Sequence, residues 1–113
     1  MIIMVTELVS AMPYALLFQA LSNPVRMDII NLLREKKKPL SVSEICIELG
    51  LEQTHVSHAL RCLTFCGLVE SAREGKSKLY SFNKQTVPSL LRAADVHLKK
   101  YATNLYTCEV LKR

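Results

Sequence analysis

Apolar residues recur every three or four positions through most of the chain, which is the spacing that buries one side of an α-helix. The pattern predicts helices over residues 1–21, 25–34, 41–50, 53–66 and 84–106. Proline fits the first turn of a helix, so Pro24 marks the start of the second one. Ser41 and Glu44 have the spacing of a capping box, and Gly50 stands where a helix usually stops. A short turn then separates two helices, as in a helix-turn-helix.

The helical spacing gives way to strand-like stretches after Gly67. Residues 68–72 and 79–82 have strand character, and residues 73–77 form a basic turn that contains Gly75. A hairpin that directly follows a polar-faced helix is typical of a wing. We therefore predict a mainly α (α+β) fold, a winged helix-turn-helix with about five helices and a two-stranded wing, in one domain. The last helix is more apolar than a single exposed helix should be, so we expect it to pair across a homodimer.

The helix over residues 53–66 has two different sides when it advances by about 100° per residue. Its apolar side carries Val56, Ala59, Leu60 and Leu63. Its other side is small, polar and basic, which suits the major groove of double-stranded DNA. The residues that we expect to contact DNA from this helix are Gln53, Thr54, Ser57, His58 and Arg61. In the hairpin, Arg73, Lys76 and Lys78 are expected to hold the phosphate backbone or the minor groove.

The chain has 113 residues and a net charge of +5, and 50% of its residues are hydrophobic. A chain of this size builds one modest core, which favours dimerisation. The positive charge favours an anionic partner such as nucleic acid, although a solubilising surface would carry the same charge. No stretch has the pattern of a secretion signal or the length of a membrane span, so we expect a cytoplasmic protein with no membrane partner. We do not expect an enzyme, because the sequence has neither a phosphate-binding glycine loop nor a Ser/His/Asp grouping.

The four cysteines are Cys46, Cys62, Cys66 and Cys108. Thiols stay reduced in the cytosol, where clustered cysteines indicate metal binding or redox activity before they indicate a disulfide framework. Cys62 and Cys66 stand four residues apart, so they stack on one edge of the helix over residues 53–66. Thiolates are soft donors that select ions such as cadmium, lead, mercury, zinc or arsenite. Cys46 has the position of a packing residue beside Ile45.

Several separate motifs occur in the order that is typical of one family. They are the stretch from Phe18 to Arg26, Gly50-Leu51, Val56-Ser57, Gly67-Leu68-Val69 and the stretch from Gly75 to Tyr80. Together they resemble the ArsR/SmtB family of winged-helix repressors over residues 14–106. The resemblance implies a homodimer built on the first and last helices, binding to a palindromic operator, and release when an inducer binds.

Two metal sites known in that family lack their ligands in this sequence. Where one class has cysteines, this chain has Ser41 and Ser43. Where another class has aspartate and histidine on the last helix, this chain has Asn83, Thr86 and Val96. The resemblance therefore implies that both of these sites are absent.

The cysteines instead resemble those of the CmtR-type branch of the family, which senses cadmium and lead. In that branch, two cysteines four apart on the recognition helix join a C-terminal cysteine of the other protomer. The resemblance implies that Cys62 and Cys66 of one chain and Cys108 of its partner bind the ion, with cadmium or lead as the favoured inducer. Two alternatives stay open. One is a thiol-redox repressor in which Cys108 forms a disulfide with a helix cysteine, and the other is a winged-helix protein-interaction module without an inducer.

Overall fold

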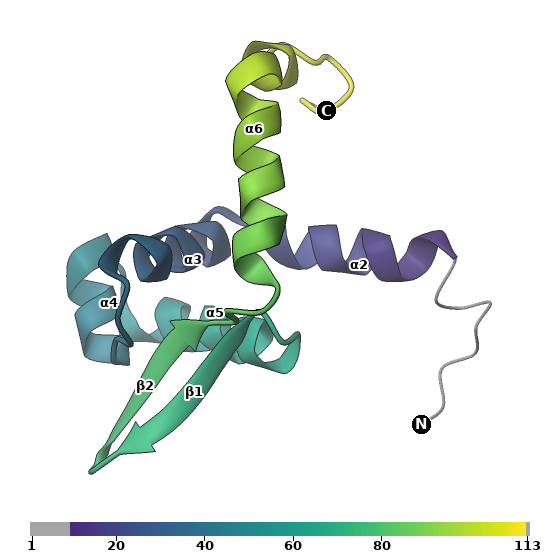
Figure 1. The fold of residues 1–113 in the computed structure, drawn as a ribbon. Helices are drawn as coiled ribbons and strands as arrows, with labels where there is room; N and C mark the ends of the chain where they lie inside the picture. The colour runs from purple at the N-terminus through teal and green to yellow at the C-terminus, as the bar shows by residue number, and fades with distance from the viewer. Residues whose placement is uncertain (1–9, 113) are drawn as a thin grey trace. The chain divides into compact units, whose positions relative to one another are not determined.

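A computed structural model describes residues 10–112 of the chain. Within them lie five helices and one antiparallel hairpin (Figure 1): α2 (Ala11–Leu21), α3 (Pro24–Lys36), α4 (Val42–Leu49), α5 (Gln53–Phe65), β1 (Val69–Glu74), β2 (Ser77–Phe82) and α6 (Val87–Tyr106). The predicted winged helix-turn-helix is confirmed, with α4 and α5 as its two helices and the hairpin as its wing. The part of the predicted first helix that precedes residue 10 lies outside the described residues.

The described part of the chain divides into two compact units, one that ends at Phe82 and one that begins at Asn83. The first unit holds the helix-turn-helix and the hairpin, and the second holds α6 and the residues that follow it. None of the helices described between residues 10 and 112 is both long enough and apolar enough to cross a membrane.

The start of α3 follows from its sequence, and its end lies two residues beyond the predicted one. The Asn23 side chain accepts a hydrogen bond from the Arg26 amide at 3.0 Å, and Pro24 occupies the first turn. The helix continues to Lys36 because glutamate and lysine are good helix formers. It ends at Lys37, which takes a left-handed conformation with φ of 57°.

The predicted capping box at the start of α4 is confirmed. The Ser41 hydroxyl accepts from the Glu44 amide at 3.2 Å, and the Ser41 amide donates to the Glu44 carboxylate at 2.9 Å. The bond from the Ser41 amide to the Glu44 carboxylate, followed by a bond from the Ser41 side chain to the same carboxylate, holds the pKa of Glu44 below its ordinary value. At the other end, Gly50 has φ of 66° and its amide donates to the Cys46 carbonyl at 2.8 Å, as the predicted stop requires.

Aliphatic side chains of α3, α4, α5 and β1 form the core of the first unit. Those that are almost fully buried are Ile29, Ile30, Leu33, Ile45, Val56, Leu60, Leu63 and Val69. Cys46 is half-buried next to Ile45, so it packs less completely than its sequence position indicates. The core fixes which side of α5 is left for solvent, and this determines the site.

The hairpin has longer strands and a tighter turn than predicted. The predicted strands over 68–72 and 79–82 become Val69–Glu74 and Ser77–Phe82, so the turn shrinks from residues 73–77 to the pair Gly75 and Lys76. Gly75 allows this because its φ of 63° is costly for other residues. Arg73 pairs with Lys78 and Glu74 pairs with Ser77, so the strands extend through polar residues. The alternation of hydrophobic residues does not predict this extension.

The last helix begins three residues later than predicted, at Val87 instead of Lys84. Residues 84–86 form a turn in which the Asn83 side chain accepts from the Gln85 amide at 2.9 Å. This side-chain bond competes with helix formation, and Pro88 then fits the first turn of α6.

Candidate functional site

The outward side of α5 gathers the helix residues that the sequence predicts for DNA contact. All of them are exposed, and together they line one shallow hollow: Gln53, Thr54, Ser57, His58 and Arg61. The opposite side of the helix is buried at Val56, Ala59, Leu60 and Leu63, as predicted. Burial of that apolar side holds α5 in one orientation, so the polar side forms a fixed and solvent-facing surface.

The hairpin presents three cations next to this helix in sequence. Arg73 and Lys78 are cross-strand neighbours, and Lys76 lies in the turn; all three are exposed. The Lys78 ammonium also lies 5.8 Å from the centre of the Tyr80 ring, a cation–π distance. Tyr80 is anchored through its backbone, which exchanges hydrogen bonds of 2.8 and 2.9 Å with Leu40. The hairpin is therefore a basic arm with one well-fixed strand.

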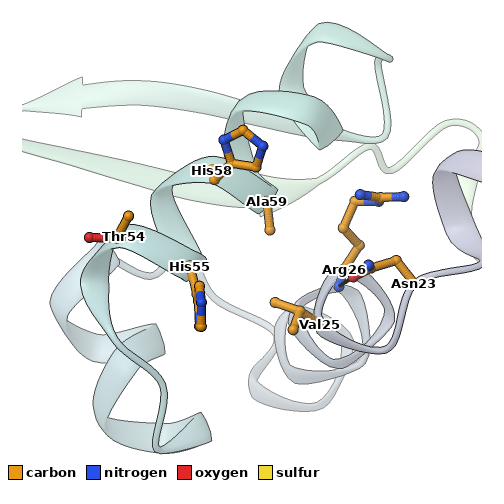
Figure 2. A pocket seen from close by; sticks show the side chains of 7 residues that line it. All are labelled: Asn23, Val25, Arg26, Thr54, His55, His58 and Ala59. Atoms are coloured by element: carbon orange, nitrogen blue, oxygen red, sulfur yellow. Dashed lines mark hydrogen bonds between the residues drawn. The ribbon is translucent and has the colours of Figure 1, made fainter.

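A second hollow adjoins the first along α5, where the start of α3 approaches the helix, and Thr54 and His58 line both hollows. Figure 2 shows Thr54, His55, His58 and Ala59 of α5 around this hollow, together with Asn23, Val25 and Arg26. The Arg26 guanidinium donates to the Ala20 carbonyl at 2.6 Å and to the Gln19 carbonyl at 3.2 Å. Arg26 therefore ties the end of α2 to the start of α3, beside the hollow that α5 lines.

The two helix cysteines form a pair at the C-terminal end of α5. Cys62 is half-buried and Cys66 is exposed, and their side chains are hydrogen-bonded to each other. Burial raises the pKa of the Cys66 thiol, the neighbouring Cys62 raises it further, and Arg26 lowers it in part. The predicted stacking of the two thiols is confirmed, and a cation that binds them has to displace protons.

The remaining cysteines lie elsewhere. Cys46 belongs to α4, and Cys108 lies in the second unit, just after α6, where its amide donates to the Leu105 carbonyl at 3.4 Å. Among the described residues of a single chain, no three His, Cys, Asp or Glu side chains are grouped closely enough to hold a metal ion. A site that shares Cys108 of a second chain stays a prediction.

Arg26, Phe65 and Tyr80 are neighbours of the site that sequence reasoning missed. The charge of Arg26, on another helix, lowers the pKa of Cys66 in part, and nothing in the periodicity of α5 reveals this effect. Phe65 is 92% exposed on a helix whose other large apolar residues are buried. Its position outside the apolar stripe was the available signal.

Known proteins with similar sequences include bacterial regulators and repressors. The sequence model described as "Bacterial regulatory protein, arsR family" matches residues 23–71. The transcriptional repressor SmtB homolog of Synechocystis is 30% identical over 96 residues, which is 85% of this chain and 71% of that protein. The chain belongs to the arsR family. The residues that match the family model, 23–71, contain α3, α4 and α5.

Two further relatives share more identity over a smaller part of their own length. The HTH-type transcriptional regulator NmtR of Mycobacterium tuberculosis is 42% identical over 79 residues, 70% of this chain and 64% of NmtR. A probable mercury resistance operon repressor of Streptomyces lividans is 33% identical over 78 residues, 68% of this chain and 60% of that protein. This arsR-family chain therefore matches less than two thirds of the length of either one.

Solved structures support the same fold. The solution structure of apo-NmtR is 35% identical with a TM-score of 0.68 and covers 88% of this chain and 81% of that chain. The homodimeric winged helix-turn-helix DNA-binding domain of Mb0332 from Mycobacterium bovis is 30% identical with a TM-score of 0.69, covering 78% of this chain and 80% of that chain.

Proposed function

We propose that this arsR-family chain is a homodimeric transcriptional repressor that binds palindromic operator DNA and leaves it when a thiophilic metal ion binds. One observation carries the proposal: α5 bears both the exposed polar surface and the Cys62–Cys66 thiol pair. An ion that binds the pair thus acts directly on the helix that would read DNA.

The DNA-binding half is supported by charge and shape. The outward side of α5 is polar and exposed, and the hairpin beyond it carries Arg73, Lys76 and Lys78. A helix of this kind fits the major groove, and cations on a wing hold the backbone beside it. The relatives point the same way, since they are named as a transcriptional regulator and as repressors.

The metal-binding half is supported by the chemistry of the donors. Two adjacent thiols fit soft ions, and we propose Cys108 of the partner subunit as the third ligand. A site with three sulfurs suits cadmium or lead better than zinc, which prefers four ligands. Mercury and arsenite are also thiophilic, and one relative is named as a mercury resistance operon repressor.

The raised pKa of Cys66 argues against the redox alternative. Redox-sensing cysteines are thiolates at neutral pH because their surroundings lower the pKa. Here burial and the neighbouring Cys62 raise the pKa, which favours the protonated thiol. A metal ion overcomes this because it binds the thiolate and releases the proton. The apparent metal affinity should accordingly increase with pH to above the ordinary thiol range, because the Cys66 thiol loses its proton only there.

The test is a cadmium titration of the fully reduced protein, followed by thiolate–metal absorption in the ultraviolet. Cys62→Ser, Cys66→Ser and Cys108→Ser should each reduce affinity strongly, because a chelate that loses one of three thiolates keeps few good donors. Cys46→Ser is the matched control, since Cys46 lies on α4 and should leave the titration unchanged. If all four variants bind cadmium like the unaltered protein, the proposed site is wrong.

The same samples test the coupling to DNA. A coupling free energy of about 1–3 kcal/mol is usual for allosteric proteins, so cadmium should weaken operator binding by about 5- to 150-fold. Fluorescence anisotropy of a labelled operator measures this directly. DNA affinity that is identical with and without the ion would remove the sensor from the proposal, and failure to bind any duplex at low salt would favour a protein-interaction module instead.

A further inference from the structure

We infer that the groove between α5 and β2 holds one strand of the DNA backbone, with the Phe65 ring packed against its deoxyribose faces. The inference rests on the proposed DNA-binding function. It adds to that function the path of one DNA strand across the protein, and it names an uncharged residue, Phe65, that contacts this strand.

The groove is open and has a volume of about 420 Å³. The lining residues that matter here are Ser57, Arg61, Thr64 and Phe65 of α5 and Lys78 and Tyr80 of β2. None of the side chains that line it is acidic, and both of its charged ones are cations. The groove therefore selects an anionic occupant.

Its position fits a duplex that lies on α5. Ser57 and Arg61 line this groove and also the hollow formed by the predicted DNA-contacting residues. The two depressions are thus continuous along the helix. When α5 occupies a major groove, the strand that borders that groove on the hairpin side runs where Arg61 and Lys78 face it.

The exposed ring of Phe65 indicates that the occupant of the groove has an apolar surface as well as negative charge. It is 92% exposed, although it lines the same groove as the cations Arg61 and Lys78. A DNA strand alternates phosphates with deoxyribose rings, whose C–H faces pack against an aromatic ring while the phosphates meet Arg61 and Lys78. The wall of the groove formed by β2 is held in place, because the backbone amide and carbonyl of Tyr80 are both hydrogen-bonded to Leu40.

The test compares Phe65→Ala with Phe65→Leu in the full-length protein. The probes are a duplex selected by the unaltered protein from a random pool and a duplex of unrelated sequence. Phe65→Ala should bind both duplexes about tenfold more weakly, near the lower end of the loss expected when an aromatic ring that stacks on a base is removed, because a sugar offers a smaller face than a base. Phe65→Leu should keep most of the affinity. The loss should be equal for both duplexes because deoxyribose carries no sequence information.

Salt dependence separates the ring from the cations beside it. Phe65→Ala removes no charge, so its plot of log affinity against log salt should keep the original slope. Lys78→Ala should reduce that slope by about 1. Ile47→Ala is the matched control for loss of an exposed apolar side chain, since Ile47 is 81% exposed on α4 and lines neither depression. It should bind both duplexes like the unaltered protein.

Several results would overturn the inference. Unchanged affinity of Phe65→Ala would do so, and a loss confined to the selected duplex would show a contact to a base in place of a sugar. A changed dimer dissociation constant, measured by sedimentation, would show that Phe65 lies between copies of the chain. If the unaltered protein selects no duplex at all, both the proposed function and the inference fail. If it selects a duplex that Phe65→Ala binds equally well, only the inference fails.

Discussion

Helices α5 and α6 differ in where their apolar sides go. In α5, the apolar stripe of Val56, Ala59, Leu60 and Leu63 is buried within the first unit. In α6, burial is confined to Val87 and Leu91 near its start, within the part of the chain that the structure describes. Further along α6, Leu98, Tyr101 and Leu105 continue the stripe and stay 45%, 40% and 42% exposed.

The difference indicates two kinds of partner. The side of α5 that remains exposed is polar and basic, so its partner should be anionic and its binding should weaken with salt. The side of α6 that remains exposed is apolar, and such a surface calls for another apolar surface. In the proposed homodimer a second copy of the chain would supply one, and the similar domain from Mycobacterium bovis is described as homodimeric.

The largest effect should come from the buried stripe of α5. Leu63 is completely buried, so Leu63→Ala should lower the free energy of unfolding by about 3 kcal/mol through lost packing and a residual cavity. Leu98→Ala is the matched change on α6 and should cost far less at concentrations where the protein is monomeric. Urea denaturation measures both. Equal losses for the two variants would contradict the distinction between the helices.

A smaller effect is expected from a charge placed on the exposed stripe of α6. Leu98→Glu should weaken the homodimer by about 2 kcal/mol, because it buries an unpaired charge at a central contact. Sedimentation equilibrium gives the dimer dissociation constant. Thr103→Glu adds the same charge on the opposite side of α6 and should leave that constant unchanged. Dimers of equal strength in the two variants would show that the stripe has another purpose.

The fold was predictable wherever a short-range signal decides the structure. The Asn23 cap, the capping box of Ser41 and Glu44, and Gly50 act over a few residues, so their geometry can be read from the sequence. The boundaries of the hairpin could not be predicted, because cross-strand pairing of Arg73 with Lys78 extends strands that have no apolar alternation. The start of α6 was missed because the Asn83 side chain competes locally for a backbone amide.

The site was predictable to the extent that it lies on one helix. Helical periodicity correctly placed the exposed residues of α5 and the stacked thiols of Cys62 and Cys66. It could not reveal that the charge of Arg26 on α3 lowers the pKa of Cys66 in part, or that Lys78 and Tyr80 of β2 complete a groove with α5, because both effects join separate elements. Whether Cys108 joins the thiol pair depends on a second chain, and it stays a prediction.

The smallest effect should be a change in salt dependence that touches DNA binding alone. Lys76 is exposed in the hairpin turn, so Lys76→Ala should weaken binding to every duplex only a few-fold. It should also reduce the slope of log affinity against log salt by about 1, because one fewer counterion is released. Lys99→Ala removes the same charge from exposed α6 and should leave the slope as it is. Since the exposed stripe of Leu98, Tyr101 and Leu105 on α6 is apolar, neither change should alter the dimer dissociation constant, which salt itself should barely affect. A slope that stays the same in Lys76→Ala would mean that the hairpin does not touch the DNA backbone. The evidence for an anionic partner of the first unit, in contrast to the apolar partner of α6, would then come from α5 alone.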